Sequence, residues 1–135
     1  MKYLIPIEPV AKGRPRFTTQ GGFSRAYSPK KNVDFENSVK AWAIGQTFFL
    51  LEKDTPLSVS VDFYITRPKS VSVKKRPFPT VKSDLDNYEK ALLDALNGIV
   101  WKDDSQIVEI RARKLYAVRG YISLRVDEYC GEIDA

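Results

Sequence analysis

One ten-residue segment, Leu57 to Thr66, alternates strictly between two kinds of residue and constrains the fold more than any other part of the chain. Its odd-numbered positions are all aliphatic or aromatic, and its even-numbered positions carry hydroxyl or carboxylate groups. In an extended strand these two sets point to opposite faces. The segment therefore predicts a sheet with one buried face and one polar face, and 135 residues are enough to build one domain around it.

The remaining pattern predicts three more strands and two helices. The expected strands are 3–7, an edge strand because Pro6 has no N–H to donate, and 107–116 and 121–126, interpreted as a hairpin. The expected helices are 32–51 and a second one that Ser83 caps and Asn97-Gly98 ends, with irregular loops at 12–31 and 67–82. We therefore expect an α+β fold, a single small domain over residues 1–135 with a mixed sheet of about four strands packed with two main helices.

The absence of histidine limits the chemistry. With one cysteine, Cys130, and no histidine, the sequence excludes a zinc site of the usual Cys/His kind and a histidine general base. A metal site would have to use oxygen ligands, which favours Mg²⁺ or Mn²⁺. No apolar run reaches the length of about 18 residues that a membrane span needs. The N-terminal apolar stretch is also too short for a secretory signal, so we expect a cytoplasmic protein without membrane contact.

The basic residues are concentrated in two segments, 11–31 and 67–82, which together hold 12 of the 22 lysines and arginines and no acid. Such segregation predicts a polyanionic partner, because cations that replace condensed counterions gain affinity for nucleic acid. In the first segment Phe17, Phe23 and Tyr27 lie between the basic residues, where they could stack on bases or anchor the loop to the core. Two solvated loops remain the alternative. The expected DNA contacts are Lys12, Arg14, Arg16, Arg25, Lys30, Lys31, Lys69, Lys74, Lys75, Arg76 and Lys82.

Two pairs of acids flank the second helix. Asp84 and Asp86 stand at its entrance, and Asp103 and Asp104 follow its exit. As structural residues, the first pair would complement the helix dipole, Lys90 would join acids at i, i+4 positions, and the second pair would form a turn. As functional residues, the four acids would make a metal site. Spacing alone leaves open whether the turn returns to the entrance or stays about 20 Å away at the far helix end.

The stretch from 82 to about 114 resembles the signature of the RusA family of Holliday junction resolvases. The residues that carry the resemblance are Asp84-Leu85-Asp86-Asn87, Lys90, Asp94-Ala95-Leu96-Asn97-Gly98 and Trp101-Lys102-Asp103-Asp104-Ser105-Gln106-Ile107-Val108. The segments Lys12-Gly13-Arg14-Pro15-Arg16-Phe17 and Tyr27-Ser28-Pro29-Lys30-Lys31 also resemble one branch of the family. One departure is that Ser83 separates Lys82 from the first acid, where many members have a basic residue or Lys-Pro directly before it.

The resemblance implies a small dimeric, magnesium-dependent endodeoxyribonuclease of a kind common in prophages and bacterial chromosomes. It implies that Asp84, Asp86 and Asp104 bind the metal and act in catalysis, that Asp103 assists, and that Lys90 is a catalytic lysine. The expected substrate is a four-way DNA junction, resolved by a homodimer through paired symmetric nicks in recombination and repair.

Two other functions remain open from the sequence. The chain could be a DNA-binding module without catalysis, in which the acids are caps and ion pairs, or a metal-dependent nuclease acting on RNA. The dimer surface is not assigned. Phe48 and Phe49 are candidates for it, and core packing explains them equally well.

Overall fold

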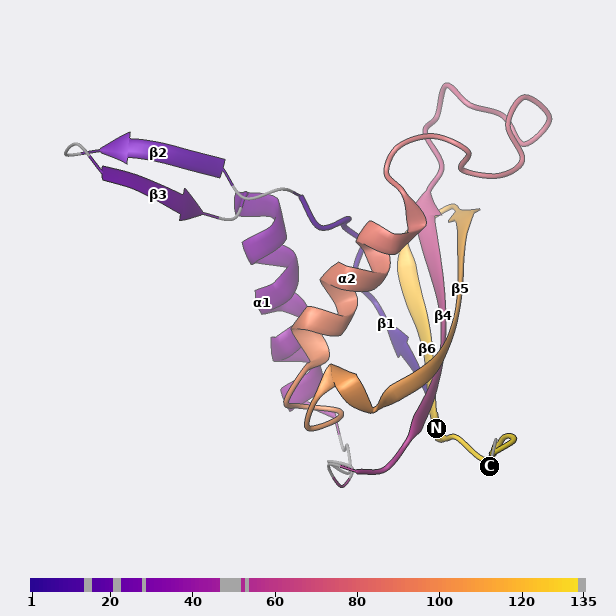
Figure 1. Cartoon of the computed structure of the whole chain (residues 1–135). Coiled ribbons are helices and arrows are strands. Elements are labelled where there is room, and N and C mark those ends of the chain that lie inside the picture. The colour runs from indigo at the N-terminus through magenta and orange to yellow at the C-terminus, as the bar shows by residue number, and fades with distance from the viewer. Residues whose placement is uncertain (14–15, 21–22, 28, 47–51, 53, 134–135) are drawn as a thin grey trace.

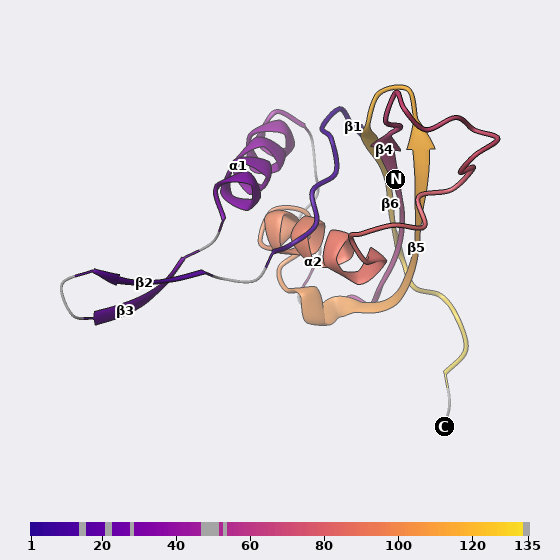
Figure 2. The same ribbon diagram turned by 90° about the horizontal axis from the view of Figure 1, so that it is seen from above.

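A computed structural model describes residues 1–13, 16–20, 23–27, 29–46, 52 and 54–133, with backbone alone for 16–20 and 23–27. The chain forms one four-stranded sheet, two helices and a separate two-stranded hairpin (Figure 1). Viewed from above, both helices lie on the same face of the sheet (Figure 2). The expected α+β domain with a four-stranded sheet and two helices is confirmed.

The elements follow in the order β1 (Lys2–Ile5), β2 (Arg16–Gln20), β3 (Phe23–Tyr27), α1 (Lys30–Ile44), β4 (Leu57–Thr66), α2 (Leu85–Leu96), η1 (Asp104–Gln106), β5 (Ile107–Ala117) and β6 (Tyr121–Glu128), where η1 is a short 3₁₀ helix. The sheet order is β1-β6-β4-β5. Strand β6 pairs antiparallel with both β1 and β4, whereas β5 runs parallel to β4. The sheet is therefore mixed, with β1 at one edge as predicted.

The predicted hairpin of β5 and β6 is wrong. These strands do not pair with each other, because β4 lies between them. Their short connection crosses the end of β4, where Arg67 N–H donates to the Ala117 carbonyl over 2.9 Å and Gly120 N–H donates to Thr66 Oγ1 over 2.8 Å. The strand with the cleanest apolar face thus takes a central place, where neighbours on both sides help to bury it.

The element boundaries differ from the prediction in three places. Helix α1 begins two residues earlier and ends at Ile44, where Gly45 forms the C-cap. The segment 47–51, with Phe48 and Phe49, lies outside the described residues. The segment 12–31 was expected to be a loop, but half of it forms the strands of the β2–β3 hairpin, whose register pairs Arg16 with Tyr27 and Gln20 with Phe23. This hairpin extends away from the sheet and helices (Figure 1).

The core lies between the sheet and the two helices. Strand β4 supplies Val59, Val61 and Phe63, each at most 2% exposed, and its burial alternates with period two as the sequence predicts. Helix α1 contributes Phe35 and Val39, and α2 adds a buried stripe at three- and four-residue spacing, namely Tyr88, Ala91, Leu92, Ala95 and Leu96. Among the described residues, neither helix is long and apolar enough to cross a membrane.

The residues that cap α2 agree with the prediction at its C-terminal end only. Asp84 occupies the N-cap and its side chain makes no capping hydrogen bond, so the prediction that Ser83 caps this helix is wrong. A capping box does occur at η1, where Asp103 and Gln106 bond to each other's backbone. Gly98 has φ +80°, a conformation that glycine adopts without strain, and it ends α2 as predicted.

The face of the sheet opposite the helices is polar. There Arg113 on β5 donates two hydrogen bonds of 2.8 Å to the Asp62 carboxylate on β4. This bonding is the main reason that the pKa of Asp62 lies below its ordinary value of 3.8. A carboxylate with a lowered pKa stabilises the fold above its ordinary pKa, and that contribution is lost as the pH falls through the folded-state value.

We therefore expect Asp62→Asn to be less stable than the wild type near neutral pH and equally stable in strong acid. The difference should be small, because Arg113 is largely exposed and solvent screens the pair. Urea unfolding at about pH 7 and about pH 2.5 would measure it. A difference that persisted unchanged at the lower pH would show that the carboxylate charge is not its cause.

Candidate active site

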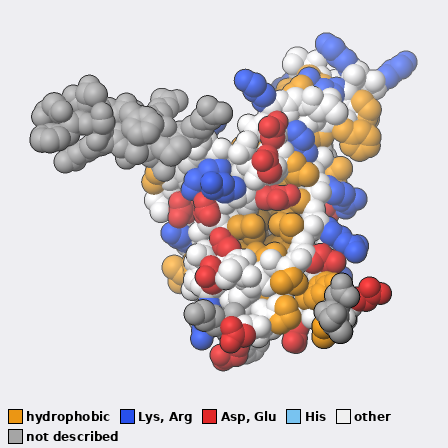
Figure 3. All heavy atoms as spheres, in the orientation of Figure 1, with side chains coloured by type: hydrophobic (Ala, Val, Ile, Leu, Met, Phe, Trp, Pro, Cys, Tyr) orange, Lys and Arg blue, Asp and Glu red, His pale blue; other side chains and the backbone are white. Residues whose placement is uncertain are grey.

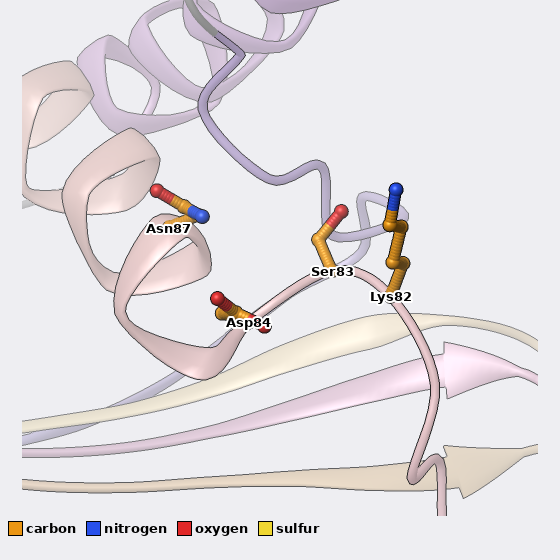
Figure 4. Close-up of a pocket in the computed structure, with 4 residues that line it drawn as sticks. All are labelled: Lys82, Ser83, Asp84 and Asn87. Carbon is orange, nitrogen blue, oxygen red and sulfur yellow. The ribbon is translucent and has the colours of Figure 1, made fainter.

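The entrance of α2 forms an open polar pocket of about 310 Å³, lined by Lys82, Ser83, Asp84 and Asn87 (Figure 4). Lys82 and Ser83 belong to the loop before the helix, whereas Asp84 and Asn87 lie at its start. Asp84 and Asp86 are both exposed, and Asp86 lies in the first helical turn, where the helix dipole favours negative charge. The entrance therefore offers carboxylate, hydroxyl and amide oxygens, the donor types that a hard cation prefers.

Long-range hydrogen bonds hold this entrance in place. From β5, the Lys114 ammonium donates to the carbonyl oxygens of Val81 over 3.0 Å and Ser83 over 2.8 Å. From the N-terminal segment, Lys12 N–H donates to the Asn87 carbonyl over 2.9 Å. The loop is thus fixed to the sheet on one side, and the first turn of α2 is fixed to the N-terminal segment on the other.

The polar face of α2 carries Asp86, Lys90 and Asp94 at four-residue steps. The ion pairs expected between these residues are not the ones that form, because Asp94 binds the Lys12 ammonium at 3.0 Å. None of the ion pairs among the described residues involves Lys90, which is exposed. Lys90 is therefore available to a ligand, whereas Lys12, predicted as a DNA contact, neutralises an acid within its own chain.

A buried asparagine fixes the segment that carries Lys12. Asn32 on α1 is 5% exposed, and its side-chain amide donates to the Ala11 carbonyl over 2.8 Å. Its Oδ1 accepts the Gly13 N–H over 3.1 Å, and a Cβ at Gly13 would lie only 2.9 Å from that oxygen. The close fit of glycine to asparagine anchors the chain just before the β2–β3 hairpin.

Beyond the exit of α2, the second acid pair sits in a tight turn. Asp103 is the N-cap of η1 and accepts the Ser105 N–H over 3.3 Å. The Asp104 carboxylate accepts the indole N–H of the fully buried Trp101 over 2.7 Å. Burial raises the pKa of Asp104, the Trp101 hydrogen bond opposes this rise, and the nearby charges of Asp94 and Asp103 add to it.

The buried side chain of Gln106 holds the turn of Asp103 and Asp104 in place through hydrogen bonds. Its side chain is 4% exposed and accepts the backbone N–H groups of Lys102 and Asp103, each over 3.0 Å. Its amide donates to the carbonyls of Glu52 and Thr55 over 2.7 and 3.1 Å. A single buried amide therefore joins the turn before β5 to the segment before β4.

The chain does not bring the two acid pairs together. They lie at opposite ends of α2 (Figure 1), a helix of 12 residues, or about 18 Å. The turn stays at the exit, near Asp94, and does not return to the entrance. Within the described part of the chain, no three acid or cysteine side chains are close enough to hold one metal ion. The entrance has suitable oxygen donors for Mg²⁺, but Asp104 is not among them.

Apart from Lys12 in the N-terminal segment, the predicted DNA contacts that the structure describes are spread over three regions. Lys30 and Lys31 are exposed in the first turn of α1, and the loop between β4 and α2 presents four exposed lysines and the half-buried Arg76. Lys and Arg side chains gather over this loop at the top of the molecule (Figure 3). Arg16 and Arg25 belong to the β2–β3 hairpin, of which the backbone is described, and Arg14 lies outside the described residues. The four loop lysines are Lys69, Lys74, Lys75 and Lys82.

The fold and site thus define a small α+β protein with an acidic helix entrance beside a basic loop. A family model described as endodeoxyribonuclease RusA matches residues 6–127, so the chain belongs to the RusA family. The chain is 34% identical over 137 residues to the uncharacterized protein YqaN of Bacillus subtilis (strain 168), covering 95% of this chain and 96% of that protein. It is 35% identical over 80 residues to a crossover junction endodeoxyribonuclease rusA of Lactococcus phage r1t, covering 57% of this chain and 58% of the phage protein.

Proposed function

We propose that this protein is a magnesium-dependent endodeoxyribonuclease that resolves four-way DNA junctions by paired symmetric nicks, in recombination and repair. The observation that carries the proposal is the family match over 6–127, within which Asp84 and Asp86 lie exposed at the entrance of α2 and Lys90 lies exposed one turn further along the helix. The phage relative supports the substrate class, because it is named a crossover junction endodeoxyribonuclease.

In this proposal Asp84 and Asp86 hold the cation at the helix entrance, beside the pocket that Lys82, Ser83, Asp84 and Asn87 line. Bound Mg²⁺ would polarise the scissile phosphate and lower the pKa of the attacking water. Mn²⁺, which takes the same oxygen ligands, is expected to substitute. Lys90 stabilises negative charge that develops on the phosphate, a role that its exposure and the lack of an ion pair to any described residue permit.

Asp104 is the third proposed acid, with Asp103 assisting beside it. Since these acids lie at the other end of α2, the proposal requires them to approach the entrance in the assembly that cuts DNA. A homodimer is the proposed assembly, because its two-fold axis matches that of a four-way junction and places one site on each of two opposed strands. The pKa of Asp104 is raised by burial and by the nearby charges of Asp94 and Asp103, and a cation that came near would favour the charged form.

The basic side chains would hold the junction arms mainly through phosphates, nearly independently of sequence. We expect both binding and nicking to weaken steeply with salt, by about tenfold or more between about 50 and 200 mM salt if several phosphates are neutralised. Junction binding measured in EDTA over a salt series would give the slope. A flat response would contradict phosphate-dominated binding.

The experiment that tests the function is nicking of a junction with Mg²⁺, Mn²⁺, Ca²⁺ or EDTA. Products with Mg²⁺ or Mn²⁺ and none with EDTA are expected. A second candidate, a DNA-binding module without catalysis, is favoured by the separation of the acid pairs and by the Lys12–Asp94 ion pair. Tight binding without nicking under any of these cations would establish that candidate instead.

A further inference from the structure

The loop between β4 and α2, residues 67–84, contains no helix or strand, as predicted, yet it is built around one side chain. The Arg67 guanidinium donates to the carbonyls of Ser72 over 3.2 Å, of Pro77 over 3.1 Å, and of Arg76. It also lies 4.3 Å from the centre of the Tyr116 ring on β5. Since Arg67 is used within the protein, its charge serves to shape the loop, and the loop's four lysines remain at the surface.

This loop presents a phenylalanine to solvent on a restrained backbone. Phe78 is 60% exposed and stands between Pro77 and Pro79, which restrict the backbone on both sides. Its carbonyl accepts the Thr80 N–H over 2.8 Å, and Pro79 is buried. The ring is therefore exposed without the entropy cost of ordering a flexible segment when it binds. Val73, 65% exposed, and Val81, 43% exposed, are the other large apolar side chains exposed on this loop.

The surroundings of the ring indicate what it binds. The segment 67–82 has six cations and no acid, and hydrophobic side chains lie among Lys and Arg side chains at this end of the molecule (Figure 3). An exposed aromatic ring beside cations is the combination that stacks on nucleobases while the cations contact phosphates. In an intact duplex the base faces are covered by their neighbours, whereas a branch point interrupts the stack and offers a free face.

The loop is also fixed to the candidate active site. Lys114 binds the carbonyls of Val81 and Ser83, and Ser83 directly precedes Asp84. The seven residues from Phe78 to Asp84 are thus tied to β5 at two points. A base held by Phe78 would consequently lie at a set distance from the entrance of α2.

We propose that Phe78 stacks on a base exposed at the branch point of a DNA junction, and that the loop held by Arg67 and Lys114 positions this contact relative to Asp84. The inference rests on the proposed function for the identity of the DNA. The Phe78 ring supplies preference for the branch, and the surrounding lysines supply affinity for any DNA.

The test is binding of a four-way junction and of its linear duplex in EDTA, by the wild type, Phe78→Ala, Phe78→Trp and Val73→Ala. Loss of one stacked base corresponds to about a tenfold loss of affinity. We expect Phe78→Ala to lose about tenfold for the junction and little for the duplex, and Phe78→Trp to retain the preference, because its ring also stacks. Val73→Ala, at an equally exposed position of the same loop, should change neither.

A fluorescent adenine analogue, 2-aminopurine, at the branch point gives an independent readout. Wild type and Phe78→Trp should quench its emission by stacking, and Phe78→Ala should not. Unchanged junction affinity and unchanged quenching in Phe78→Ala would overturn the inference, as would equal losses for junction and duplex. Because Phe78 is exposed, its truncation should leave the thermal unfolding midpoint unchanged, which excludes misfolding as the cause.

The binding assay is independent of cleavage, so the inference and the proposed function can fail separately. Loss of junction preference in Phe78→Ala, with a wild type that nicks no DNA, would uphold the stacking contact and reject the nuclease. Metal-dependent nicking, with an unchanged junction preference in Phe78→Ala, would uphold the nuclease and reject the stacking contact.

Discussion

Asp86→Asn should bind a four-way junction as tightly as the wild type and fail to nick it. The substitution keeps the size of the side chain and removes the charge that the proposed metal site needs at the entrance of α2. Loss of several kcal/mol of metal-assisted stabilisation corresponds to about a thousandfold in rate. Single-turnover nicking and junction binding, measured on the same preparation, would separate the two effects.

The matched control is Asp34→Asn, which makes the same change of charge at an exposed acid on α1. It should nick at a rate close to that of the wild type. Equal rates for Asp86→Asn and Asp34→Asn would remove Asp86 from the site. A variant of Asp86 that lost binding and nicking together would indicate a role in folding or in DNA contact, and not in the chemical step.

Trp101→Ala should have the largest effect on stability. Trp101 is fully buried in the core, and removal of a buried aromatic ring usually costs about 3–5 kcal/mol of unfolding free energy. Trp101→Phe should cost much less, because a smaller ring still fills most of the space. Urea unfolding of both variants would measure the two costs, with Trp42→Ala, a half-buried position on α1, as the milder comparison.

Trp101→Phe also isolates the hydrogen bond to Asp104. The indole N–H lowers the pKa of Asp104 against the effect of burial, so its loss should raise that pKa further above the ordinary value of 3.8. A raised carboxylate pKa means that ionisation costs stability, so the variant should lose stability relative to the wild type as the pH rises through that pKa. An Asp104 titration that was unchanged in Trp101→Phe, followed by NMR, would contradict this account.

The sequence predicted those elements whose pattern is local. Strand β4 was predicted to the residue because its period-two alternation is unbroken. Helix α2 was predicted because its apolar residues repeat at helical spacing up to Asn97-Gly98, but its N-cap is Asp84 and not Ser83. The β5–β6 pairing was predicted wrongly, because the three residues between these strands also suffice to cross the end of β4. Nothing local in 118–120 distinguishes a turn between neighbours from a crossing over one strand.

The candidate site was predicted in the same uneven way. The entrance acids follow from sequence and helix geometry, but the supports at the two ends of α2 do not, since Lys114, Asn32 and Gln106 act through contacts with distant segments. Helix geometry also allowed Lys90 to pair with acids on its own helix, and the ion pair of Asp94 with Lys12 was not predicted. In the structure Lys114 stands beside the buried Phe63 of β4, in line with Ala112. The sequence did not reveal this position, because the pairing of β4 with β5 was not predicted. The role of Arg67 was hidden, because an arginine among lysines resembles another surface cation.

The measurement that tests the central claim most directly is a map of the nicks that the wild-type protein makes in a synthetic four-way junction with Mg²⁺, beside the linear duplex of the same sequence. The account predicts paired nicks at symmetric positions on two opposed strands of the junction, with the duplex left intact. Two results would contradict a resolvase and indicate a nuclease of another specificity. One is nicking of the duplex at a similar rate, and the other is a nick in one strand of the junction without a matching nick in the opposed strand.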